Sequence, residues 1–212
     1  MRSPFAAWDL AAPKGSSRGH RSTSGMNPVA RDRTHPLPRI KVVNTVVSSQ
    51  LTREINLERL GSAFIDSSYN PETFPGLIYR RLDPRATMIM FSTGKLVSTG
   101  ASSVRKARRA ITVTAAEIGK VEGTSIRANR VRVENLVVTG ELGSPLDLAR
   151  ASVTLNQTSY EPEVFPGVMW KGPEHTVVLV FSSGKVVCTG ARRLGEAARA
   201  VSEIARLLEH ER

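Results

Sequence analysis

The chain has little cysteine, few aromatic residues and no long apolar segment. Its 212 residues include one Cys, Cys188, and only 5% Phe, Trp and Tyr. A lone Cys cannot close an internal disulfide or build a metal site, which fits a reducing, intracellular setting. No apolar run approaches the length that spans a bilayer, and Asp9 and Pro13 interrupt any signal-peptide core. These absences argue against a membrane-bound or secreted protein.

Acidic residues are also scarce relative to basic ones. The chain has 30 Lys and Arg against 19 Asp and Glu, a net charge of +11. Residues 1–38 hold six of the basic and two of the acidic residues, so they carry +4 and the remainder carries +7. Such a surplus suggests a polyanionic partner such as nucleic acid, while a merely soluble basic protein remains the alternative.

Residues suited to catalysis are poorly arranged in the sequence. None of the four histidines, at positions 20, 35, 175 and 210, stands beside a plausible nucleophile or ligand set. The segment STGKLVSTG lacks the spacing of a phosphate-binding loop. We therefore expect no enzymatic activity, no catalytic residue, no cofactor and no metal.

The first 38 residues differ in composition from the rest. They are rich in Ser, Gly, Pro and Arg and lack apolar periodicity, which predicts a disordered basic arm. Met26 is a plausible alternative start of translation, which would leave residues 1–25 out of the native protein. Mass spectrometry of the native N-terminus would decide this.

From residue 39 the chain repeats itself. Three pairs of segments match in order: IKVVNTVVSSQL with VRVENLVVTGEL, YNPETFPGLIY with YEPEVFPGVMW, and FSTGKLVSTGA with FSSGKVVCTGA. The match extends over most of each copy, so it predicts an internal duplication with two like units about an approximate two-fold axis. We place the first repeat at 39–128 and the second at 129–212.

Periodicity predicts the elements of one repeat. RIKVVNTVVSS alternates as a strand, a helix follows within 51–64 with Thr52 as its candidate cap, and GLIYRRL, TMIMFST and KLVSTGA are short strands. A closing helix over 103–119 completes the unit, which is therefore an α+β layer structure. The apolar positions predicted for the two closing helices are Val104, Ala107, Ile111, Ala115 and Ile118, and Leu194, Ala197, Val201, Ile204 and Leu208.

Both faces of the predicted sheet are apolar. Met88 and Met90 point one way and Ile89 and Phe91 the other, yet two helices per repeat can cover only one face. An apolar face without a cover marks a binding site or an interface, unless a second copy or the N-terminal arm buries it. The residues on this face are Val46, Ile89, Phe91, Val97, Thr99, Val137, Leu179, Phe181, Val187 and Thr189, with Phe74 and Phe165 beside them.

These duplicated motifs resemble the TATA-box-binding protein family of general transcription initiation factors. The resemblance covers about residues 39–210 and rests on the Asn-containing strands, YNPETFPG with YEPEVFPG, and FSTGKLVSTGA with FSSGKVVCTGA. It implies a saddle of two tandem pseudo-symmetric repeats. One curved antiparallel sheet of ten strands would face DNA, with four helices on its convex side.

The resemblance also assigns roles on the concave sheet. Phe74 with Phe91, and Phe165 with Phe181, would wedge into the base steps at the two ends of a TATA box and bend the DNA. Asn44 and Asn135 would meet near the pseudo-dyad and donate to minor-groove acceptors. The neighbouring residues would exclude the guanine amino group: Val46, Val137, Thr99, Thr189, Ile89, Val97, Leu179 and Val187.

Charged residues receive roles in the same way. The matched cations Arg80, Lys171, Lys95 and Lys185 would meet phosphates, with solvated surface charge as the alternative for each. By family analogy, Glu161 and Glu163 would receive transcription factor B, which leads to RNA polymerase recruitment, with a solvated acidic loop as the alternative. The basic run at 104–109 would meet other initiation factors or flanking DNA, although a plain solvated face is equally consistent.

Two features separate this chain from typical members. Pro75 stands where the first repeat of eukaryotic members usually has a small residue, so both copies read FPG and the halves are more alike. The compact repeats and short arm resemble archaeal members, although these tend to be acidic rather than +11. An archaeal source would place the protein in the cytoplasm or nucleoid, and a eukaryotic source in the nucleus.

Two other classes compete with DNA binding. A module that holds a lipid or other apolar ligand would co-purify with it and lack salt-sensitive DNA affinity. A dimerisation scaffold would lose stability when Phe74 or Phe181 is replaced by Ala. The same face could also pair two copies of the chain into a homodimer when DNA is absent.

Overall fold

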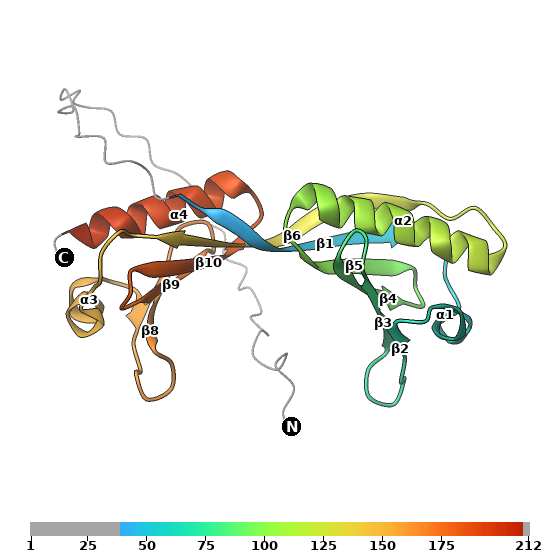
Figure 1. Ribbon diagram of the computed structural model, residues 1–212, viewed down its shortest axis with the longest axis horizontal. Coiled ribbons are helices and arrows are strands. Elements are labelled where there is room, and N and C mark those ends of the chain that lie inside the picture. Colours follow the sequence, from blue (N-terminus) through green and yellow to red (C-terminus); the bar gives the residue numbers. More distant parts are fainter. Residues whose placement is uncertain (1–38, 210–212) are drawn as a thin grey trace, which may run out of the picture. The chain divides into compact units, whose positions relative to one another are not determined.

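The computed structural model describes residues 39–209. The predictions for the arm at 1–38 lie outside these residues. Ten strands form one antiparallel sheet in the order β2-β3-β4-β5-β1-β6-β10-β9-β8-β7 (Figure 1). Their bounds are β1 Lys41–Leu51, β2 Ser67–Ser68, β3 Gly76–Arg81, β4 Ala86–Phe91, β5 Lys95–Ala101, β6 Ala128–Glu141, β7 Thr158–Ser159, β8 Gly167–Lys171, β9 Val177–Phe181 and β10 Lys185–Ala191.

The strand order is symmetric about the pair β1 and β6, one from each repeat. Four helices, α1 Leu57–Ala63, α2 Val104–Glu122, α3 Leu148–Thr154 and α4 Leu194–Leu207, belong to the same two repeats. Figure 1 shows α2 and α4 along the convex side of the curved sheet, while the loops before β3 and β8 project from the opposite side. The predicted saddle of two α+β repeats is confirmed. No helix between residues 39 and 209 is both long and apolar enough to cross a membrane.

Each repeat has its own hydrophobic core. In the first, Leu77, Met88, Met90 and Leu96 from the sheet pack with residues of α2, and all four are fully buried. In the second, the core lies between the sheet and α4 and includes Val138. Burial of large side chains of this kind contributes about 1.5–3 kcal/mol each. The helices thus pack against one face of the sheet, and the other face is left uncovered within the described residues.

The hairpin turns between β4 and β5 and between β9 and β10 are set by glycine. Gly94 and Gly184 both have φ of +80°, a conformation that other residues rarely adopt. A Cβ on Gly94 would lie 2.4 Å from the carbonyl oxygen of Arg53, and one on Gly184 would lie 2.3 Å from that of Ser144. The predicted TG and SG turns are therefore fixed by both backbone conformation and space.

The first short helix begins later than periodicity predicted. Thr52 is not its cap, because β1 continues to Leu51 and Thr52 instead pairs with the backbone of Arg127. Asn56 caps the helix, accepting a hydrogen bond from the backbone N–H of Arg59 at 2.9 Å. Phe64 follows the helix and stacks on Tyr79, with ring centroids 4.6 Å apart.

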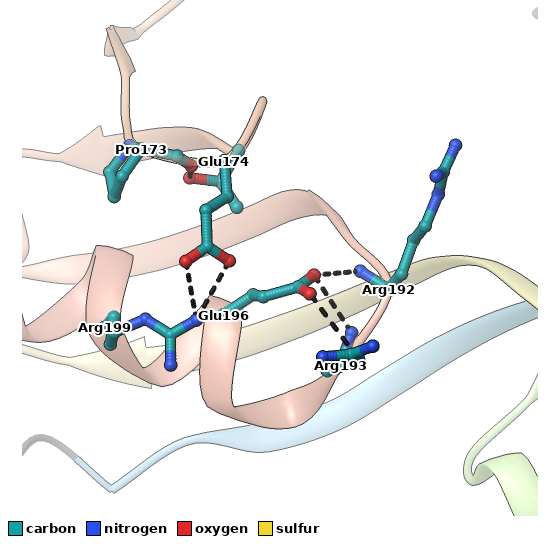
Figure 2. A network of polar contacts seen from close by, with 7 residues as sticks. Pro173, Glu174, Arg192, Arg193, Glu196 and Arg199 are labelled. Carbon is teal, nitrogen blue, oxygen red and sulfur yellow. Dashed lines mark hydrogen bonds and ion pairs between the residues drawn. The ribbon is translucent and has the colours of Figure 1, made fainter. Parts of the chain in front are cut away.

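The closing helices start differently in the two repeats. The Ser103 side chain caps α2 by accepting from the backbone N–H of Lys106. In α4 the Glu196 carboxylate reaches back to the N–H groups of Arg192 and Arg193, at 2.7 and 3.1 Å (Figure 2). These bonds hold the pKa of Glu196 below its usual value. Leu194, predicted to be core, is 50% exposed because it lies in the first turn.

Candidate nucleic-acid interface

The face of the sheet opposite the helices is apolar, as the alternation predicted. Met88 and Met90 are fully buried beneath α2, whereas Ile89 and Phe91, which alternate with them along β4, are only half-buried. Two rows of paired residues cross this uncovered face. They are Ile78, Ile89, Val97 and Ser48 in one half, and Met169, Leu179, Val187 and Thr139 in the other.

The outer and inner members of these rows were not predicted from the sequence. Ile78 and Met169 lie on the second strand of each repeat and face the same way as the predicted residues. The signal was present, since Leu77 and Tyr79 alternate with Ile78 and one set had to face away from the helices. Ser48 and Thr139 are short and polar, so apolar alternation alone gave no reason to select them.

A pair of phenylalanines stands at each end of the face. The ring centroids of Phe74 and Phe91 are 6.0 Å apart with an interplanar angle of 62°. The values for Phe165 and Phe181 are 5.8 Å and 61°. Phe74 is 38% exposed, so part of a large apolar side chain is left in contact with water. The structure therefore brings the four predicted Phe residues together as two nearly identical edge-on pairs.

The FPG glycines make these pairs possible. A Cβ on Gly76 would come within 2.7 Å of the Phe74 ring and 3.2 Å of the Phe91 ring. A Cβ on Gly167 would come within 2.9 Å of the Phe165 ring. Each glycine is the register partner of the strand Phe beside it, so the loop Phe folds over bare backbone. The repeated motif thus has a steric basis.

The two predicted asparagines are held in matching orientations near the pseudo-dyad. The side-chain oxygen of Asn44 accepts from the backbone N–H of Gly100 at 2.7 Å, and that of Asn135 accepts from Gly190 at 2.8 Å. Across the dyad, Asn44 pairs with Val137 and Val46 with Asn135. Because the amide oxygen is already engaged, the amide NH₂ is the group each Asn offers to the surroundings. The Asn135 NH₂ also donates to Thr189 at 3.0 Å.

The four predicted cations border this apolar surface. Arg80 and Lys95 in the first repeat, and Lys171 and Lys185 in the second, are all exposed. Arg80 pairs with Thr87 and Lys171 with Val177, so both continue the uncovered side of their strands. Positive charge at the rim of an apolar sheet is suited to a ligand with an apolar groove and an anionic backbone.

The projecting loops before β3 and β8 share a fold but not a charge. In both, the loop Phe donates its backbone N–H to a carbonyl four residues earlier, that of Asn70 at 3.0 Å or Glu161 at 2.9 Å. Glu161 and Glu163 are exposed. The second loop therefore presents two carboxylates where the first presents Asn70 and Glu72.

Within residues 39–209 the side chains form no group of three or more His, Cys, Asp or Glu that could hold a metal ion. Cys188 lies fully buried in the core of the second repeat, and burial raises the pKa of its thiol to about 11. A neutral, enclosed thiol is unsuited to nucleophilic chemistry at neutral pH. The conspicuous chemistry of this chain is the uncovered face.

Comparisons with known proteins agree with this geometry. The family model described as transcription factor TFIID (or TATA-binding protein, TBP) matches residues 39–121 and 130–210. The TATA-box-binding protein of Thermococcus celer is 39% identical over 172 residues, which cover 81% of this chain and 91% of the relative. That of Pyrococcus horikoshii is 39% identical over 175 residues, which cover 81% and 90%.

A solved structure gives the same result at the level of the fold. Methanococcus jannaschii TBP superposes with a TM-score of 0.74 at 35% sequence identity, covering 82% of this chain and 99% of that one. The curated relatives named above and this structure are archaeal, as the compact repeats suggested. The chain belongs to the TATA-binding protein family.

Proposed function

We propose that this protein is a general transcription initiation factor that binds A·T-rich promoter DNA through the minor groove and bends it. The observation that carries the proposal is the pair of matched Phe clusters at the two ends of one uncovered apolar sheet. The relatives of this chain are named TATA-box-binding proteins, and we propose for this chain the same binding role without enzymatic activity.

The Phe pairs would act as wedges. Inserting apolar side chains into a base step unstacks it and bends the duplex, and the loss of stacking is offset by the larger contact surface. Phe74 and Phe91 would enter one end of the site, and Phe165 and Phe181 the other. Each pair is already assembled on its glycine before DNA arrives, so little ordering is required on binding.

The centre of the face would provide the preference for A·T pairs. In the minor groove A·T and T·A pairs present only acceptors, and the NH₂ groups of Asn44 and Asn135 are donors. The surrounding surface is apolar and offers no acceptor to a guanine amino group over most of its area. Its proposed contact residues are Val46, Ile89, Val97, Thr99, Val137, Leu179, Val187 and Thr189.

Phosphate contacts would come from Arg80, Lys95, Lys171 and Lys185 at the rim. A plot of the logarithm of the binding constant against the logarithm of salt concentration has a negative slope. Removing one of these cations should reduce the size of that slope by about 0.9. Replacing Arg80 and Lys95 by Gln should therefore flatten the slope by about two and weaken binding to all sequences alike.

The acidic loop of the second repeat supports a further part of the proposal. Glu161 and Glu163 are exposed beside one end of the site, where a basic partner could reach both protein and DNA. We assign this loop to transcription factor B, whose binding would bring RNA polymerase to the promoter. The Glu161→Gln, Glu163→Gln variant should lose that partner while retaining DNA affinity, and a loss of both would contradict the assignment.

A gel-shift titration tests the proposed function. The full chain is added to an A·T-rich duplex and to a G·C duplex of equal length, at several salt concentrations. We expect a shift with the A·T duplex that weakens steeply as salt rises and a much weaker one with the G·C duplex. Folded protein that shifts neither duplex, or that elutes as a dimer which DNA does not dissociate, would contradict the proposal.

A further inference from the structure

The symmetry of the uncovered face breaks beside its centre. Asn44 and Asn135 occupy matching positions in the repeats, and the residues immediately before them are Val43 and Glu134. Both are bulged residues, since the register between β1 and β6 skips Val43 between Val42 and Asn44 and skips Glu134 between Asn135 and Val133. One repeat thus places an apolar residue, and the other a carboxylate, at a bulge next to its central Asn.

Contacts place the Glu134 carboxylate on the uncovered face. The hydroxyl of Ser48 donates to its Oε1 at 2.5 Å. Ser48 faces away from the helices, because its neighbours Val47 and Ser49 are buried and it pairs with Val97 in the row described above. The carboxylate therefore lies in the half of the face that belongs to the first repeat. Val43, 41% exposed, occupies the corresponding bulge of β1, opposite Val137 and Val138 of the second repeat.

Other charges near the centre do not cancel this difference. Arg132 is the register partner of Ser48, and Lys41 is the partner of Thr139 in the other half, so both halves have a cation there. The second carboxylate on this face, Glu141, pairs with Lys185 at the end of its strand. Glu134 is accordingly the charge that distinguishes the two halves beside the central asparagines.

A carboxylate changes what this half of the face can recognise. An ionised carboxylate only accepts hydrogen bonds, and the minor-groove edges of A·T and T·A pairs also only accept. The amino group of guanine is the one donor in the minor groove. Ser48 occupies one oxygen of Glu134 and fixes its position, which leaves the other oxygen available to accept from a base.

We infer that Glu134 is a specificity-determining residue that favours a guanine amino group on the first-repeat side of the bound DNA. Val43 provides no such acceptor, so the preference is one-sided. A box with a single G·C pair on that side would then be bound in one orientation by the sheet itself, before any partner joins. This inference rests on the proposed minor-groove binding.

The test compares G·C with inosine·C pairs, which differ only in the guanine amino group. One such pair is placed at each position in turn of a palindromic A·T-rich duplex. A fluorophore at one end of the duplex distinguishes the two orientations in which the protein can bind. The wild-type chain should prefer G·C over I·C by about tenfold at one position and should bind that duplex in one orientation.

Three variants sharpen the result. Glu134→Gln should lose the preference for G·C, because its amide also donates and can satisfy an A·T acceptor. Val43→Glu should create a second preferred position in the other half and remove the orientation bias. Glu141→Gln, a matched control on the same strand, should leave both unchanged. Unaltered thermal melting shows that each variant is folded.

The outcomes separate this inference from the proposed function. Salt-sensitive A·T binding with equal affinity for G·C and I·C at every position would overturn the role of Glu134 while leaving the function standing. A uniform gain of affinity in Glu134→Gln would overturn it too, since that result indicates repulsion from phosphates. Absence of binding to every duplex would instead contradict the proposed function.

Discussion

The two repeats share a scaffold but differ in charge and in the polarity of their cores. Residues 39–128 contain 14 basic and 7 acidic residues, whereas residues 129–212 contain 10 of each, so the net charges are +7 and zero. The core of the first repeat contains the hydroxyl groups of Thr45, Ser98 and Thr114, and no partner for them is found within the described residues. The second repeat has Leu136, Cys188 and Ile204 at those positions.

The features that both repeats retain are those of the uncovered face. The Phe pairs, their glycines and the Gly-bonded asparagines match closely in geometry between repeats. Features away from the uncovered face have diverged, including helix caps, core polarity and loop charge. The proposed DNA bend explains this pattern, because each end of the bend needs the same wedge. Partner binding and core stability do not require the two repeats to be alike.

The largest expected effect comes from removing one wedge. Phe74→Ala with Phe91→Ala, or Phe165→Ala with Phe181→Ala, should lower affinity for the A·T duplex about 100-fold, because stacking on a base is worth about 1–3 kcal/mol. Fluorescence anisotropy measures this loss. Both variants should melt near the wild-type temperature, since the rings face away from the helix cores. A large loss of stability would instead support a dimerisation scaffold.

Replacing the FPG glycines should have the next largest effect. Gly76→Ala puts a methyl group 2.7 Å from the Phe74 ring and should displace it, lowering affinity about tenfold. Gly167→Ala should do the same at the other end. Gly61→Ala is the control, because its Cβ would meet only ordinary contacts at 3.6 Å. Unchanged affinity in Gly76→Ala would show that the ring position is unimportant.

Much of this architecture was predictable from sequence, because the duplication and the alternating strands are local patterns. The helix-facing residues and the four Phe positions follow from them. The Thr52 cap was wrong because β1 runs further than its apolar alternation indicated. The Glu134 bulge could not be predicted, because a skipped residue is fixed by pairing between strands far apart in the chain. The held orientation of Asn44 likewise depends on Gly100, which only the fold brings near.

The difference in core polarity predicts smaller effects, which have opposite signs in the two repeats. Thr114→Val removes a buried hydroxyl and should raise the free energy of unfolding by about 1–2 kcal/mol. The mirror change, Ile204→Thr, should lower it by about 2 kcal/mol. Chemical denaturation measures both. If Thr114→Val is destabilising, the hydroxyl has a stabilising role and the comparison of the cores is wrong.

The smallest expected effect concerns the helix caps and depends on pH in one repeat only. The pKa of Glu196 is lowered in the folded state, so its stabilising effect is present above the unfolded pKa and is lost as pH falls through the folded one. The Glu196→Gln variant should therefore melt at a lower temperature than wild type at neutral pH, and the two melting temperatures should converge in acid. Ser103→Ala should cost about 1 kcal/mol at every pH. Thermal melts across pH distinguish them.

The proposed bend requires two wedges that act at the two ends of one DNA site, and base unstacking reports on each separately. A duplex that is bound in one orientation and carries 2-aminopurine at either end of the A·T box brightens when that base step opens. With wild-type protein we predict a rise in fluorescence at both ends. The Phe74, Phe91 double variant should lose the rise at one end and the Phe165, Phe181 variant at the other. Bound DNA that brightens at neither end, or at both ends with either variant, would contradict the account.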